Sequence, residues 1–192
     1  TSFEEPFRWT GTDWMMKEID EYEKDYPNLL KHSLDYPTPD YLRSIVKIGN
    51  IGCVSDMSYA SEGSNLIKDR ILDEDDRPLY IQVWGGTNTI ARALKDIQEK
   101  YQNQPEWSQL HDAISKKVIL TACGEQDTTY RDYIAEEWPQ IQFVTCLQMK
   151  SYAYLWFMMP ECESKNTLKA KFMKEEIMNG KSALANGYCT WL

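Results

Sequence analysis

The fold is decided by the stretch Leu79-Tyr80-Ile81-Gln82-Val83-Trp84-Gly85-Gly86-Thr87-Asn88. Residues 79–84 are mostly β-branched or aromatic, and such a run is typical of a strand. Gly85 and Gly86 break the strand, and Thr87 can cap a helix over residues 88–100. The stretch therefore predicts a buried strand that passes directly into a helix.

Helices and strands alternate downstream of this stretch. A helix over residues 106–116 leads to a strand over 117–122, and a helix from Thr128 or Thr129 leads to a strand over 141–146. This alternation is the pattern of a parallel sheet, whose right-handed crossovers place helices against its faces. We therefore expect an α/β fold with a mostly parallel sheet and helices on both faces.

Helical patterns also precede and follow the predicted sheet. Residues 13–26 read as a helix that Thr12 can cap and Pro27 ends. Thr38 and Pro39 can begin a second helix, residues 62–72 form a third, and residues 168–178 are amphipathic. No repeat or linker divides the chain, so we expect a single domain over residues 1–192.

Composition and charge restrict the class of partner. The chain is 42% hydrophobic and 27% charged, which is a globular composition. Its formal net charge of −9 argues against a nucleic-acid partner or an anionic membrane, because either would be repelled. No apolar stretch approaches the roughly 20 residues that cross a bilayer. Nothing in the sequence indicates an oligomeric state.

The cysteines do not form a zinc-binding pattern. The chain holds five, widely spaced and without a Cys-x-x-Cys pair, and free thiols are the expected state. They are Cys53, Cys123, Cys146, Cys162 and Cys189.

The turn after the first predicted strand is a candidate ligand site. In open α/β sheets, ligands bind outside the carboxyl ends of the strands. Gly85 and Gly86 lack side chains there, so a ligand could approach the backbone, and Asn88 offers an amide that donates and accepts. The alternative is that the two glycines serve only the turn, and the sequence leaves both interpretations open.

A second candidate follows the next strand, at Gly124-Glu125-Gln126-Asp127. Two carboxylates and an amide could hold sugar hydroxyls, or one carboxylate could act as a base. The alternative is that Asp127 caps the following helix. Because parallel strands end at the same edge, we expect Gly85, Gly86 and Asn88 to share an open rim with Gln126 and Asp127.

The chain resembles the nucleoside-hydrolase-like family of cellulose-binding domains. The resemblance is carried by residues 77–91, Pro27-Asn28-Leu29-Leu30-Lys31-His32, Ser61-Glu62-Gly63-Ser64, and Gln126-Asp127 with its following helix. These stretches occur in order across about residues 20–145.

The resemblance implies the α/β fold of the nucleoside hydrolases, which cleave an N-glycosidic bond with a calcium-activated water. It implies that calcium is held by an Asp cluster on the first strand and by a main-chain carbonyl that corresponds to Trp84. Glu62, Asn88 and Asp127 match as ligand contacts.

This sequence departs from the family pattern because no Asp-rich first strand is present. We therefore expect a fragment that lacks the first strand and is incomplete at both ends, with calcium bound only in the complete parent domain. Glycan-associated relatives are commonly exported, which would make the protein secreted or periplasmic, although the chain carries no export signal.

Two functions follow from these patterns. The first is hydrolysis of an N-glycosyl bond in a nucleoside-like ligand by the complete parent domain. The second is non-catalytic binding of a carbohydrate such as cellulose, with aromatic side chains stacked on sugar rings.

Overall fold

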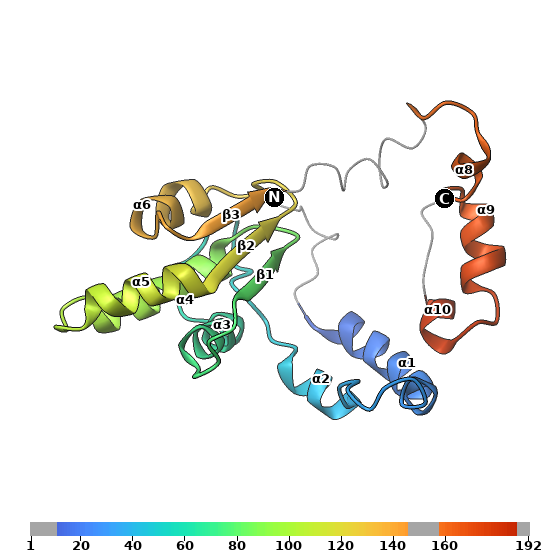
Figure 1. Cartoon of the computed structure of the whole chain (residues 1–192), viewed down its shortest axis with the longest axis horizontal. Helices are drawn as coiled ribbons and strands as arrows, with labels where there is room; N and C mark the ends of the chain where they lie inside the picture. Colours follow the sequence, from blue (N-terminus) through green and yellow to red (C-terminus); the bar gives the residue numbers. More distant parts are fainter. Residues whose placement is uncertain (1–10, 146–157, 188–192) are drawn as a thin grey trace. The chain divides into compact units, whose positions relative to one another are not determined.

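The computed structural model describes residues 11–145 and 158–187, which group into two compact units (Figure 1). The first unit holds described residues 47–145, and the second holds residues 11–46 and 158–187. The single domain expected over residues 1–192 stays a prediction.

The first unit is built on a three-stranded parallel sheet in the order β1-β2-β3 (Figure 1). β1 spans Leu79–Val83, β2 spans Val118–Ala122 and β3 spans Gln142–Thr145. Tyr80 lies opposite Ile119 in the register, and Ile119 lies opposite Gln142. The predicted parallel α/β arrangement is confirmed, and all three strands lie where the sequence places them to within one residue.

The helices of this unit follow the predicted order. α3 spans Glu62–Leu72, α4 spans Asn88–Tyr101 and α5 spans Trp107–Lys117, and these are followed by a π-helical turn η1 (Tyr130–Ile134) and a short α6 (Ala135–Glu137). The hydroxyl of Ser61 accepts the Ser64 N–H in a capping box that begins α3. Thr87 makes no side-chain cap on α4, contrary to expectation, because its hydroxyl donates to Asp127 instead.

One face of the sheet carries the hydrophobic core. Leu94 and Ile97 of α4 and Ile114 of α5 are buried against Val118 and Leu120 of β2, and Trp138 after α6 closes the same core. Burying side chains of this size contributes about 1.5–3 kcal/mol each. This layer explains why alternate residues of β1 and β2 are apolar.

The other face of the sheet remains accessible within residues 47–145. Tyr80 and Gln82 of β1 and Gln142 and Val144 of β3 are exposed. The described helices α4 and α5 of this unit pack with the core on the opposite face. β1 accordingly alternates between core-facing and exposed side chains.

The second unit consists of helices. α1 spans Asp13–Leu29 and α2 spans Pro39–Ile45, where the hydroxyl of Thr38 caps α2 as predicted. Thr12 makes no side-chain cap on α1. Pro27 does not end α1 as expected, because the helix continues past it to Leu29.

The amphipathic segment near the C-terminus is helical, beginning at Ala170 rather than at residue 168. It consists of α9 (Ala170–Phe172) and a π-helix η3 (Met173–Met178), and it lies between α8 (Glu163–Asn166) and α10 (Ala183–Gly187). The carboxylate of Asp25 in α1 accepts the N–H groups of Ala183 and Leu184, which caps α10 and holds the pKa of Asp25 below its ordinary value.

No described helix has the length and apolar character needed to cross a membrane. Within the described chain, Cys53, Cys123 and Cys162 are free thiols, as expected, while Cys146 and Cys189 lie outside the described residues.

Stability should fall at alkaline pH because of Tyr133. Its hydroxyl donates to Gln98 Oε1 at 2.6 Å and accepts from Trp138 Nε1 at 3.3 Å, and burial raises its pKa to about 12. The unfolded chain ionises this tyrosine near pH 10, so the stabilisation present below pH 10 is lost as the pH rises towards 12. We expect the difference in urea unfolding free energy between the native chain and Tyr133→Phe to shrink over that range. A difference that stays constant from pH 9 to pH 12 would contradict this account.

Candidate functional site

The loops that follow β1 and β2 lie together at the carboxyl edge of the sheet. The backbone N–H of Asn88 donates to Asp127 Oδ2 at 3.1 Å, and Gln126 Nε2 donates to the carbonyl of Trp84 at 2.9 Å. The predicted proximity of Gly85, Gly86 and Asn88 to Gln126 and Asp127 is therefore confirmed. We call these two loops the rim.

The contacts of Asp127 are those of a structural cap. Its Oδ1 accepts from the Thr87 hydroxyl at 3.0 Å and from the N–H and hydroxyl of Thr129 at 3.2 and 2.8 Å. Its Oδ2 accepts the N–H of Asn88 at the start of α4. Both oxygens thus satisfy groups of the protein at helix starts, where a carboxylate is also favoured by the helix dipole. The expected ligand contact of Asp127 stays a prediction.

The two glycines of the loop after β1 have different surroundings. A Cβ on Gly86 would lie 2.3 Å from Asp127 Oδ2 and 2.7 Å from its carboxyl carbon, whereas a Cβ on Gly85 would meet nothing within 4 Å. The close approach that the sequence suggests at this turn is made at Gly86 by a protein carboxylate. Gly85 is the glycine that faces open space.

Asn88 brings a third segment to the rim. Its side-chain amide donates to the carbonyls of Asn50 at 2.7 Å and Asp56 at 3.0 Å. The hydroxyl of Ser55, between them, accepts the N–H of Thr128 at 3.1 Å. Sequence reasoning missed segment 50–57, because it has neither helical nor strand periodicity. One signal in the sequence is Gly49, directly before the segment, where a Cβ would lie 2.5 Å from the hydroxyl of Thr89.

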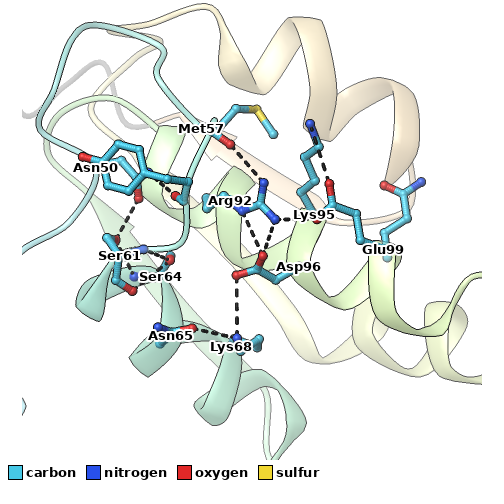
Figure 2. Close-up of polar contacts among 12 residues, drawn as sticks. Asn50, Met57, Ser61, Ser64, Asn65, Lys68, Arg92, Lys95, Asp96 and Glu99 are labelled. Carbon is cyan, nitrogen blue, oxygen red and sulfur yellow. Dashed lines mark hydrogen bonds and ion pairs between the residues drawn. The ribbon is translucent and has the colours of Figure 1, made fainter.

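A buried arginine holds the end of the same segment (Figure 2). Arg92 lies one turn after Asn88 on α4 and donates to the carbonyl of Met57 at 3.2 Å. Its guanidinium also binds Asp96, with Nε–Oδ1 at 2.9 Å, and Glu99 at 2.6 Å. These carboxylates raise the pKa of Arg92 against the lowering effect of burial, so the charge is retained. Figure 2 also shows Asn50 bonded to the hydroxyl of Ser61, which ties the segment to α3.

Glu62 is exposed in the first turn of α3. No hydrogen bond in the described part of the chain joins it to Asn88, Gln126 or Asp127. The structure thus brings together the rim residues predicted from the sequence, but it does not join Glu62 to them.

Beside the rim lies the accessible sheet face, which we call the open face. The side chains of Trp84 and Tyr80 are 65% and 63% exposed, and Trp84 Nε1 lies 3.5 Å from Gln82 Oε1 on the same side of β1. The open face carries no charged side chain, although 27% of the chain is charged. It consists of Tyr80, Gln82, Trp84, Ile119, Thr121, Gln142 and Val144. Sequence reasoning missed Tyr80 and Gln82, although their alternation with Ile81 and Val83 was visible.

The described residues do not fit a calcium site. The Trp84 carbonyl, the expected main-chain ligand, already accepts from Gln126, and both oxygens of Asp127 accept from the protein. No group of three or more His, Cys, Asp or Glu side chains arranged to hold a metal occurs within residues 11–145 and 158–187. Calcium binding by the complete parent domain stays a prediction.

A polar cavity of about 310 Å³ lies at the opposite, amino end of β1. Its cations are paired within the protein, since Lys117 Nζ lies 2.7 Å from Asp73 and Arg77 binds Asp75. Little charge is left for an ionic ligand, so the rim and the open face remain the better candidates.

Comparison with known proteins gives one family and one solved structure. Residues 3–192 match the model of the family described as cellulose-binding Sde182, nucleoside hydrolase-like domain. The fold is similar to that of a nucleoside hydrolase-related hypothetical protein from Saccharophagus degradans that is associated with carbohydrate metabolism, with a TM-score of 0.76 and 27% sequence identity. The alignment covers 96% of this chain and 40% of that protein, so this chain spans well under half of its length. None of the curated proteins gives a match.

Proposed function

Because the chain belongs to the family of cellulose-binding, nucleoside hydrolase-like domains, we propose that it binds a neutral polysaccharide of the cellulose class on the open face around Trp84. One observation carries the proposal. An acidic chain with a net charge of −9 presents a sheet face without a charged residue, and two aromatic rings project from it.

The physical argument starts from the chemistry of the ligand. A sugar ring offers a face of C–H groups and an edge of hydroxyls, so aromatic rings with nearby amides match it. Trp84 and Tyr80 supply the rings, while Gln82 and Gln142 supply amides that both donate and accept. A charged ligand would find no partner among these side chains.

The rim supports the open face by fixing the end of β1. Gln126 binds the carbonyl of Trp84, and Asp127 caps the helix that follows. A ring that is held before the ligand arrives loses less conformational freedom on binding. In this proposal Gln126 and Asp127 position Trp84 and do not act as a base.

Hydrolysis of an N-glycosyl bond is the second candidate, favoured by the similarity to a nucleoside hydrolase-related protein. It needs a carboxylate free to activate water, yet Asp127 is engaged on both oxygens. This candidate predicts that the full-length parent, supplied with calcium, releases a base or a reducing sugar from a panel of nucleosides and glycosides.

Sedimentation with microcrystalline cellulose tests the binding proposal. We expect the native chain to be retained and Trp84→Ala to bind at least about tenfold more weakly, as is typical of a central aromatic contact. Tyr41→Ala is the matched control, since Tyr41 is 54% exposed on α2, outside the open face.

Retention should not change when a calcium chelator is added, because the described contacts of the open face contain no metal ligand. The proposal is wrong if the native chain does not sediment with cellulose. It is also wrong if Trp84→Ala binds cellulose as tightly as the native chain and the Tyr41→Ala control do.

A further inference from the structure

The two aromatic rings of the open face are spaced along one strand. Tyr80 and Trp84 are four residues apart, and alternate residues of a strand point to the same face. With a rise of about 3.3 Å per residue, their Cα atoms lie about 13 Å apart. The Trp84–Gln82 contact of 3.5 Å shows that the face continues past the end of the strand. This spacing is longer than a single sugar ring.

The neighbouring strand leaves room beside these rings. Tyr80 pairs with Ile119 in the register and Gln82 pairs with Thr121, and both β2 side chains are only partly exposed. The side chains of Tyr80 and Trp84, at 63% and 65% exposure, are therefore more accessible to a ligand than their neighbours on β2. An elongated ligand can lie along β1 in contact with both rings.

We infer that Tyr80 and Trp84 bind two separate rings of one extended glucan chain that runs along β1, with Gln82 placed to bond hydroxyls between them. A β-linked glucan is an extended ribbon, so its rings stay in line with the strand. An α-linked glucan is curved, so it can contact only one of the two rings at a time. The inference rests on the proposed function and adds the two separate ring contacts and the length of the ligand.

The affinity should depend on the length of the glucan, because one ligand chain makes both contacts. Once Trp84 holds one sugar ring, the rest of the same chain is present at high effective concentration near Tyr80. A disaccharide reaches one aromatic ring, and a chain of several rings reaches both. Affinity should therefore rise with chain length until the chain spans both rings, and the loss of Tyr80 should weaken the binding of longer ligands more than that of a disaccharide.

Isothermal titration calorimetry with cellobiose, cellohexaose and maltohexaose tests this inference on the full chain. For the native chain we expect cellohexaose to bind at least about tenfold tighter than either of the other two. Tyr80→Ala should bring the cellohexaose affinity to within about twofold of the cellobiose affinity, because only one ring contact then remains for either ligand. Tyr80→Phe, which keeps the ring, should retain the length dependence, and Tyr41→Ala should behave as the native chain.

The outcomes separate this inference from the proposed function. The inference alone is overturned if Trp84→Ala weakens the binding of cellohexaose but the affinity of the native chain does not depend on ligand length. Equal losses for cellobiose and cellohexaose in Tyr80→Ala also overturn it, as does maltohexaose binding as tight as cellohexaose binding. No binding of any of the three sugars and none of cellulose removes the proposed function as well. Melting temperatures of all variants within a few degrees of native exclude misfolding as the cause of a loss.

Discussion

Gly86→Ala should destabilise the first unit by about 2 kcal/mol or more, because the new Cβ would overlap the carboxylate of Asp127. This added Cβ would lie 2.3 Å from Oδ2 and 3.1 Å from the Cβ of Asp127, so turning the short side chain cannot relieve the clash cheaply. Moving Asp127 would also release the N–H of Asn88 at the start of α4. A lost cap of this kind costs about 1 kcal/mol.

The neighbouring glycine is a matched control for this experiment. Gly85→Ala places its Cβ in open space, so we expect a change within about 0.5 kcal/mol. Urea unfolding followed by circular dichroism gives both values. Equal stabilities for Gly86→Ala and Gly85→Ala would contradict the contact between Gly86 and Asp127.

Asp127→Ala should cost about 2–3 kcal/mol, since it removes the cap on α4 and the acceptor of Thr87 and Thr129 together. Asp127→Asn should cost less. Its amide oxygen can still accept from Thr129, while its NH₂ group takes the place of the oxygen that faces the Asn88 N–H.

Glu125→Ala is the control for the removal of a carboxylate, because Glu125 is exposed on the same loop. Its unfolding free energy should stay within about 0.5 kcal/mol of native. The losses in Gly86→Ala and Asp127→Ala should not add in the double variant, because both changes remove the same contact. Full additivity would mean that the two residues act independently.

Much of the fold could be predicted from local patterns. The strand that contains Tyr80 and the helix that begins at Asn88 are visible because β-branched residues, paired glycines and helical spacing agree along residues 79–101. The proximity of the loops after β1 and β2 followed from the rule that parallel strands end at one edge.

The direction in which the rim side chains point could not be read in the same way. A polar residue at a carboxyl edge can serve a ligand or a helix start, and Asp127 and Asn88 have the residue types for both. In the structure their described hydrogen bonds are made within the protein. Segment 50–57 was missed for a related reason, since its order comes from contacts with α4 and not from its own sequence pattern.

The open face was missed because a run of apolar and aromatic residues does not reveal which of its faces is buried. Tyr80 and Trp84 resemble core residues by type, and only packing separates them from Ile81 and Val83. The ligand contacts expected at Asn88, Gln126 and Asp127 stay predictions. In the proposed function these polar residues position the end of β1, and the exposed rings beside them bind the ligand.

Mapping of backbone amide chemical shifts during titration with cellohexaose tests the site most directly. The account predicts that the largest changes occur at Tyr80, Gln82 and Trp84, with smaller ones at Thr121 and Val144 and none along α4 and α5. Changes confined to those helices, or to the second unit with β1 unaffected, would contradict it.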